Sequence, residues 1–205
     1  LAKRRIVEAR LSTVQAHADP DFIFDILTRI EALYGHDAER AELLLSQLID
    51  FLREALPRVR DGRTTLGREA RLVGAWLAIA RVRLDDRLEY AIDIPQSLAG
   101  LPFHAMLLLP LVTGVLRSAA GRGGRIAVGA EALGDRIRIS VTEDDRDSGG
   151  FPADGFDEFD ELRTRLVDLY GEKAQLSIGT ATMSRRTIAL EIPAEMNEPA
   201  TATGA

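Results

Sequence analysis

The sequence predicts an α+β protein in which an N-terminal helical hairpin is followed by an α/β sandwich. As far as Leu56, apolar residues recur at three- and four-residue steps, which is the spacing of amphipathic helices. Beyond residue 66, helical spacing alternates with short runs in which every second residue is apolar, a pattern typical of strands. We therefore expect two domains, residues 1–60 and 66–193, joined by a polar linker and followed by a disordered tail over residues 194–205.

The hairpin consists of two predicted helices. The first runs from Ile6 to Leu33, and Asp19-Pro20 makes it kink or restart, because Asp favours the cap and Pro the first turn of a helix. The second runs from Ala41 to Leu56 and stops at Pro57. A hairpin of two amphipathic helices leaves an apolar face uncovered, so we expect two copies of the chain to form a four-helix bundle, which makes a homodimer.

The α/β part reads as three helices and five strands. The expected helices are 66–84, 101–116 and 161–170, the last closed by Gly171. The expected strands are 88–94, 125–129, 136–141, 175–179 and 186–192. Between them, residues 143–160 form an acidic loop that contains three glycines and a proline.

Composition narrows the functional classes. The chain has no cysteine, which excludes disulfides, and its net charge of −6 disfavours nucleic-acid binding, which needs a basic surface. No apolar run reaches the roughly 18–20 residues that span a bilayer. We expect a cytoplasmic protein without direct membrane contact, or the cytoplasmic part of a membrane-anchored sensor, because the chain begins with Leu1 and an upstream segment can precede it.

Four segments resemble motifs of the LytS/YehU-type sensor histidine kinases. Residues 19–25, D-P-D-F-I-F-D, are similar to the phosphoacceptor box N-P-H-F-L-F-N, and residues 48–53 resemble L-x-D-L-L-R. Residues 75–84 resemble Y-L-x-I-E-x-x-R-F, and residues 162–171 resemble the L-R-N segment that follows the ATP lid. The resemblance covers about residues 5–193 and implies a dimerisation hairpin followed by a GHKL (Bergerat-type) ATP-binding sandwich. It also implies ATP and Mg²⁺ as cofactors and a response regulator as partner.

The sequence departs from the family pattern at the residues that would accept phosphate and bind ATP. The acceptor histidine is replaced by Asp21, and His17, one helical turn earlier, is the other phosphoacceptor candidate. In the segment that resembles Q-P-L-V-E-N-A-x-x-H-G, the acid, the Mg²⁺-binding asparagine and the histidine are replaced by Thr113, Gly114 and Ser118.

The remaining ATP motifs also differ. Glu143-Asp144 stands at the D-N of the adenine pocket, and the glycine-rich motif before the last helix has lost its glycines. Between Glu143 and Glu161 there are nine carboxylates and one basic residue, Arg146, so a triphosphate would meet like charge. We interpret the ATP site as degenerate and expect no cofactor. ATP and Mg²⁺ would be ligands only if the ATP site were functional.

Three functions fit this sequence. The first is a degenerate histidine kinase, or pseudokinase, that acts as a dimeric adaptor and binds a response regulator or partner kinase through residues such as Asp21, Asp25 and Arg53. The second is an active kinase or histidine phosphotransferase that passes phosphate through His17 or Asp21. The third is a hairpin whose only role is to dimerise an upstream sensor.

Overall fold

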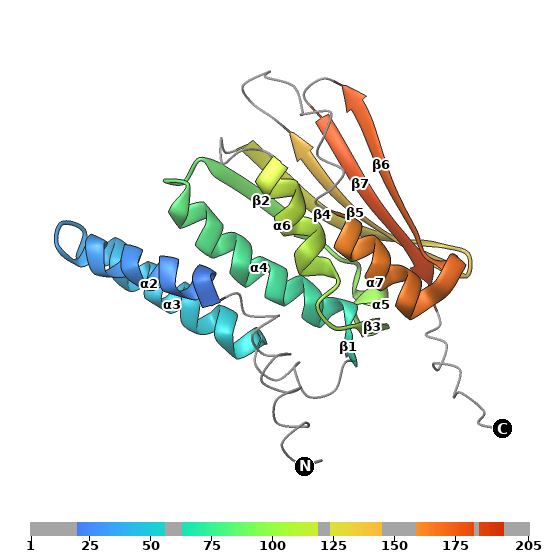
Figure 1. The fold of residues 1–205 in the computed structure, drawn as a ribbon, viewed down its shortest axis with the longest axis horizontal. Helices are drawn as coiled ribbons and strands as arrows, with labels where there is room; N and C mark the ends of the chain where they lie inside the picture. Colours follow the sequence, from blue (N-terminus) through green and yellow to red (C-terminus); the bar gives the residue numbers. More distant parts are fainter. Residues whose placement is uncertain (1–19, 56–62, 119–123, 145–158, 183–184, 195–205) are drawn as a thin grey trace, which may run out of the picture.

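The computed structural model describes residues 20–55, 63–118, 124–144, 159–182 and 185–194. It contains an N-terminal hairpin, α2 (Pro20–Tyr34) and α3 (Ala38–Ala55), that lies beside the longest helix of the α/β part (Figure 1). Helix α2 begins at Pro20, where the fixed φ of proline suits a first turn. Asp37 caps α3, because its carboxylate accepts the backbone N–H of Arg40 at 3.1 Å. The predicted stretch from Ile6 to Asp19 and the predicted tail lie outside the described residues.

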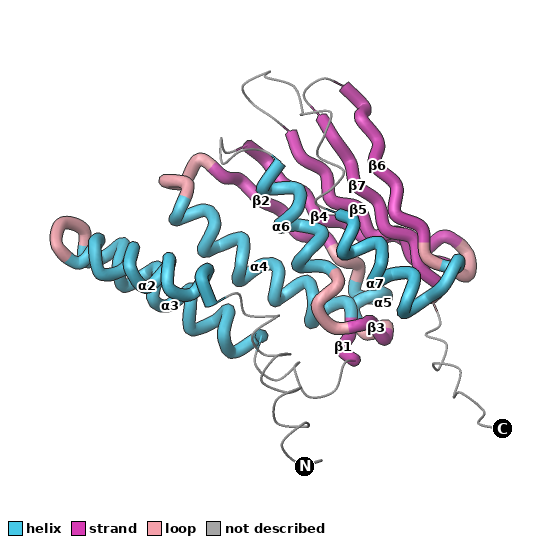
Figure 2. Tube along the Cα trace, viewed as in Figure 1, coloured by secondary structure: helices cyan, strands magenta, loops and turns pink. Residues whose placement is uncertain are grey.

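The second part is a two-layer sandwich, as predicted. Its five-stranded sheet has the order β2-β4-β5-β7-β6, with β2 and β4 parallel and the other pairs antiparallel. The strands are β2 (Leu88–Asp93), β4 (Gly124–Leu133), β5 (Arg136–Asp144), β6 (Gln175–Thr182) and β7 (Arg185–Pro193). Helices α4 (Leu66–Arg83), α6 (Leu108–Ser118) and α7 (Asp160–Tyr170) cover one face of this sheet (Figures 1 and 2). The 3₁₀ turn η3 (Gly171–Lys173) follows α7.

The alternation of apolar residues along the strands shows which face of the sheet lies in the hydrophobic core. On β5, every second residue from Ile137 to Val141 is buried against the helices, and on β7 the same holds from Ile188 to Ile192. The opposite face carries polar pairs, such as the ion pairs of Arg138 with Glu131 and Glu191. Gly171, at φ +59°, ends α7 as expected, because a side chain is disfavoured in that conformation.

The sequence prediction was wrong for residues 101–107, which are not helical. Strand β3 (Pro102–His104) pairs there with β1 (Arg63–Thr65), a strand placed inside the predicted linker, and α6 begins only at Leu108. A short helix, α5 (Gln96–Ala99), precedes β3 and was not predicted. The run from 101 to 116 is apolar throughout because it is buried, so its composition does not distinguish a helix from a buried strand and turn.

Two charged residues fix the turn between β3 and α6. The buried carboxylate of Glu69 on α4 accepts the backbone N–H groups of Met106 at 3.1 Å and Leu108 at 3.4 Å. Arg165 on α7 donates to the carbonyl oxygens of Ala105 at 2.8 Å and Met106 at 3.0 Å. Burial lowers the pKa of Arg165, and the negative charges of Glu69 and Glu161 oppose that shift. The turn therefore ties α4 and α7 to the start of α6.

The hairpin and the sandwich share one hydrophobic core. Phe22 of α2 stacks on Trp76 of α4 at a ring distance of 6.1 Å and meets Phe51 of α3 edge-on at 5.7 Å. Ile26 and Leu48 of the hairpin belong to the same cluster of buried residues as Leu72 and Leu77 of α4. Helix α4 thus covers one apolar face of the hairpin within a single chain. Within the described ranges, no helix has the length and apolarity needed to cross a bilayer.

A tyrosine on α7 allows a test of this packing by pH. Burial raises the pKa of the Tyr170 hydroxyl to about 12, above the value of about 10 in an unfolded chain. The stability that comes from keeping this group neutral is therefore complete below about pH 10 and is lost as the pH rises towards 12. We expect Tyr170→Phe to flatten the fall in unfolding free energy over this window in urea titrations. The half-exposed Tyr34, changed to Phe, is the control; equal slopes for both variants would contradict the assignment.

Candidate functional site

The five residues that the sequence analysis assigned to a degenerate ATP site lie on two elements. Thr113, Gly114 and Ser118 are on α6, and Glu143 and Asp144 form the end of β5. The structure brings α6 and β5 together, because α6 packs on the face of the sheet that contains β5. The first turn of α7 and the start of β7 complete the surroundings of these residues.

The position next to Gly114 is filled by an aromatic ring. Phe159, the residue before α7, is fully buried, and its ring lies against Gly114. A Cβ atom at Gly114 would lie 2.6 Å from Cε1 and 3.0 Å from Cζ of Phe159, closer than van der Waals contact allows. The ring can occupy this place only because residue 114 has no side chain.

The carboxylate of Glu143 is held by a buried cation. Arg186 stands directly opposite on β7, and its Nη2 lies 2.8 Å from Oε2 of Glu143. Each side chain is only 5% exposed. The same nitrogen also lies 3.4 Å from the carbonyl oxygen of Val115 on α6. Two opposite charges removed from water together cost far less than either one alone, so the pair is stable only while both members remain.

The neighbouring polar groups also have partners within the chain. Arg185 makes two hydrogen bonds to the carboxylate of Asp144, at 2.6 and 3.0 Å, and these bonds lower the pKa of that carboxyl group. The hydroxyl group of Thr113 donates to the carbonyl oxygen of Pro110 at 3.2 Å, within its own helix. The side chain of Ser118 lies outside the described residues. Among the described residues, no group of three or more acidic or histidine side chains converges as a metal site would require.

Four residues of the hairpin were proposed as phosphoacceptors or as contacts of a partner protein. His17 and the side chain of Asp21 lie outside the described residues. Asp25 on α2 forms an ion pair with Arg83 on α4 at 2.6 Å, so its carboxylate faces the sandwich. Arg53 on α3 is exposed and pairs with Asp50 of its own helix at 3.7 Å. The side chain of Arg53 is 76% exposed and that of Asp25 is 55% exposed, so both described candidates are open to solvent.

Phe159 and Arg186 were not predicted from the sequence as residues of this site. For Arg186 a signal was present: Glu143-Asp144 and Arg185-Arg186 are complementary dipeptides on two predicted strands, and they face each other in register. For Phe159 there was no such signal, because a phenylalanine in an acidic loop gives no indication of the glycine that it contacts.

The fold is that of a histidine-kinase ATP-binding domain with a preceding hairpin. A bacterial phosphotransferase whose structure was solved at 1.7 Å superimposes on the chain with a TM-score of 0.53 at 17% identity, covering 89% of this chain and 94% of that one. A family model described as histidine kinase matches residues 9–88.

Two curated proteins are similar to almost the whole chain. The sensor histidine kinase BtsS of Escherichia coli strain K12 is 27% identical over 200 residues, covering 93% of this chain and 34% of that protein. The sensor protein LytS of Staphylococcus haemolyticus is 28% identical over 208 residues, covering 94% of this chain and 35% of that protein. The predicted resemblance is therefore confirmed: the chain is similar to LytS-type sensor histidine kinases over more than nine-tenths of its length. It spans about a third of the length of these relatives.

The buried pair gives a prediction for stability. We expect Arg186→Ala to lower the free energy of unfolding by about 3–5 kcal/mol, because it leaves the buried Glu143 carboxylate without its counter-charge. Replacing both members with apolar residues, as in Glu143→Leu with Arg186→Met, should restore most of that loss. Arg185→Ala, on the same strand but at an exposed pair, is the control and should change the denaturation midpoint little. A loss in the double variant as large as in the single one would show that the charges are not the cause.

Proposed function

We propose that this chain is a degenerate histidine kinase, a pseudokinase, that acts as a dimeric adaptor or regulator in two-component signalling and does not turn over ATP. The observation that carries this proposal is that two positions of the family's nucleotide site are filled by side chains of the chain itself. The ring of Phe159 fills the space beside Gly114, and the guanidinium group of Arg186 forms an ion pair with the carboxylate of Glu143.

The residues present do not fit ATP with Mg²⁺. By the family resemblance, residue 114 would supply an amide ligand for the metal and residue 143 a carboxylate for the adenine. Glycine has no such ligand. The Glu143 carboxylate is already bound by Arg186, so a nucleotide's N–H groups would compete with a buried guanidinium group for it. The acid-rich stretch from 143 to 161 adds repulsion of the phosphates.

Nucleotide binding is the direct test. We expect isothermal titration of the chain with ATP and Mg²⁺ to give no binding heat at protein concentrations up to about 100 μM, where a site of micromolar Kd would be obvious. A micromolar Kd would contradict the proposal. So would labelled phosphate transferred from ATP to the chain and lost in His17→Ala or Asp21→Asn, a result that would support the alternative of an active kinase or phosphotransferase.

The dimer part of the proposal rests on a second apolar face of the hairpin. Helix α4 covers the face that contains Phe22 and Ile26, yet Phe24 and Leu27 of α2 are 66% and 43% exposed, and Ile49 of α3 is 42% exposed. Leu45 and Leu52, half-buried, lie one turn on either side of Ile49 on α3.

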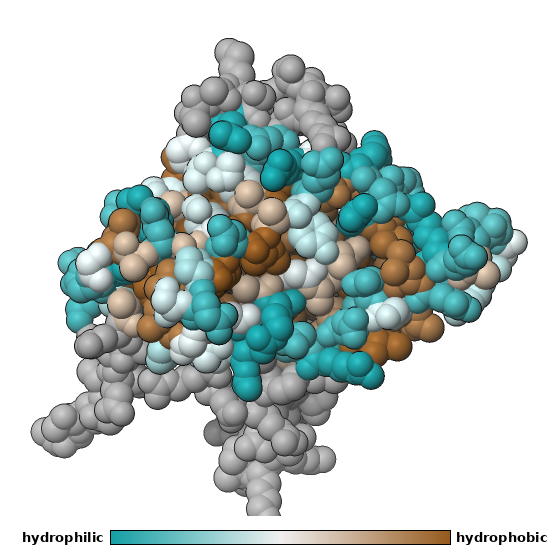
Figure 3. Space-filling model, turned by 180° about the vertical axis from the view of Figure 1, so that it is seen from behind, coloured by the Kyte–Doolittle hydropathy of each residue, from teal (hydrophilic) through white to brown (hydrophobic). Residues whose placement is uncertain are grey.

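These residues share one side of the hairpin. The residues of α2 that contact α4 or the turn after it are Phe22, Asp25 and Arg29, and helical geometry at about 100° per residue places Leu27 on the far side from them. The same geometry places Ile49 away from Arg40 and Glu54, the contacts of α3 with α4. The view from behind shows apolar residues on the hairpin surface, at the right of Figure 3. A second copy of the same face would bury them in a four-helix bundle.

Substitutions on this face test the dimer. We expect Leu27→Glu with Ile49→Glu to convert the chain from dimer to monomer in analytical ultracentrifugation, because four charges would be buried in a symmetric interface. Leu43→Glu is the matched control: Leu43 is 49% exposed on the same helix but lies about 120° away from Ile49 around the helix axis. A wild-type chain that sediments as a monomer, or a control as disruptive as the double variant, would contradict this interface.

The partner of the adaptor is the remaining part of the proposal. The response regulator or partner kinase would bind the hairpin, where Asp21, Asp25 and Arg53 are the candidate contacts. The net charge of −6 supports a protein partner over a nucleic acid. We place the module in the cytoplasm, without direct membrane contact of its own.

A further inference from the structure

The turn between α4 and β2 contains two aspartates in an unusual backbone conformation. Asp85 has φ +51° and Asp86 has φ +61°, so two successive residues lie in the left-handed region. Glycine, asparagine and aspartate are the residues that adopt this conformation most readily, and of these only aspartate adds a charge. The presence of a carboxylate at both positions suggests a role for the charges, and their contacts show where that role lies.

Both carboxylates reach the hairpin, and Asp86 also pairs through Oδ1 with Arg81 of α4 at 3.1 Å. Asp85 Oδ1 lies 3.3 Å from Nη2 of Arg29 on α2 and 3.4 Å from Nη2 of Arg40 on α3. Asp86 Oδ2 lies 3.3 Å from the same nitrogen of Arg40. Arg40 also donates to the carbonyl oxygen of Val82, at the end of α4, at 3.1 Å. One turn of the sandwich thus binds both helices of the hairpin.

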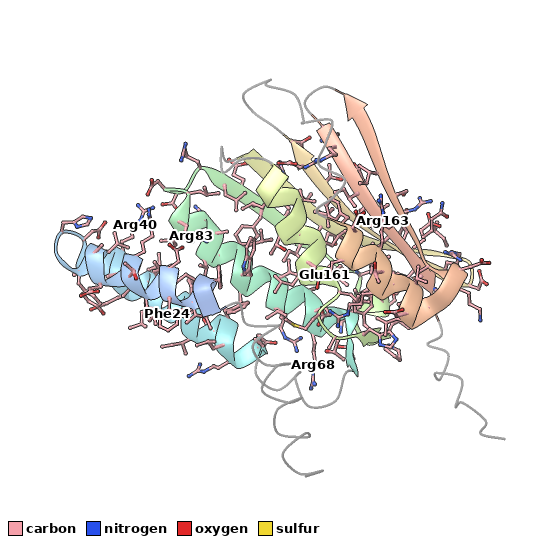
Figure 4. All side chains as sticks on the ribbon, viewed as in Figure 1. Phe24, Arg40, Arg68, Arg83, Glu161 and Arg163 are labelled. Atoms are coloured by element: carbon pink, nitrogen blue, oxygen red, sulfur yellow. The ribbon has the colours of Figure 1, made fainter. Side chains whose placement is uncertain are left out.

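A second contact stands next to this turn. Arg83, in the last turn of α4, pairs with Asp25 of α2 at 2.6 Å and lies over the ring of Phe22 at 5.8 Å. Figure 4 shows Arg40 and Arg83 close together where the hairpin meets the end of α4. The stacked pair of Phe22 and Trp76 is therefore bordered by ion pairs on the side of the α4–β2 turn.

We propose that the α4–β2 turn, with Asp85 and Asp86 bound to Arg29 and Arg40, is a releasable latch that holds the hairpin closed on α4. The buried apolar contacts define the closed position, and the ion pairs add a small stabilisation that depends on charge. The aspartate side chains are more than half exposed, so salt screens these pairs readily. Such contacts suit a reversible closure rather than a permanent one. This latch does not depend on whether the chain binds nucleotide.

The only tryptophan of the chain reports on the latch. Trp76 is nearly buried beneath Phe22, so an open hairpin exposes it to water. In the full chain we expect Asp85→Asn with Asp86→Asn to red-shift the Trp76 emission at low salt and to speed hydrogen exchange of α2 and α3 about three- to tenfold. Asparagine tolerates the left-handed conformation, so the change removes charge and keeps the turn. The wild-type chain in about 1 M salt should behave in the same way.

The controls separate the latch from general destabilisation. Asp50→Asn with Arg53→Gln removes an exposed ion pair within α3 that does not reach α4, and it should change neither signal. Exchange of β5 and β7 should stay the same in every variant. If the asparagine variant fails to fold, Asp85→Gly with Asp86→Gly supplies a backbone suited to the turn without the carboxylates, and it must open the hairpin too. Unchanged emission and exchange without the carboxylates, or an equal response of the α3 control, would overturn the proposal.

Discussion

The burial of α4 on two sides is the constraint on which this molecule depends. One side of the helix packs on the sheet and on α6, while Trp76 and its neighbours receive the hairpin. Most residues of α4 are consequently buried, including Glu69 near its start. A helix buried in this way cannot change its position towards one neighbour without disturbing the other. The hairpin and the sandwich are therefore coupled through a single element.

The buried charge at Glu69 extends this coupling to the site. Glu69 fixes the first amides of α6, and Arg165 fixes the carbonyl groups of the same turn from α7. Gly114 follows on α6, and Phe159 immediately precedes α7. The close approach of Phe159 to Gly114 is thus held by polar contacts at some distance from it. The hairpin, the β3–α6 turn and the contact between Gly114 and Phe159 belong to one connected set of packed elements.

The sequence alone predicted the features that depend on local patterns of apolar residues. The period of α2 and α3 and the alternation of β5 and β7 predicted elements that the structure confirms, because each has one face buried and one exposed. The start of α6 was not predictable, since the backbone N–H of Leu108 donates to the carboxylate of Glu69, which lies 39 residues earlier in the chain. The absence of a side chain at Gly114 was visible in the sequence, but the ring that fills its place was not, because tertiary packing brings Phe159 there. Asp25 was named as a candidate partner contact, but its pairing with Arg83 was not predictable because it depends on how the hairpin docks.

The contact between Gly114 and Phe159 limits the substitutions that this chain can accept during evolution. An asparagine at residue 114 would bring its Cβ into the ring, so that substitution alone would be selected against as a packing defect. A smaller residue at 159 alone would leave a cavity in the core and supply no metal ligand. Each single step back towards the family pattern therefore passes through a less stable protein, and Arg186 imposes the same condition at Glu143. The two contacts therefore hinder a return to the family pattern, because each return requires two substitutions together, on segments that are far apart in the sequence.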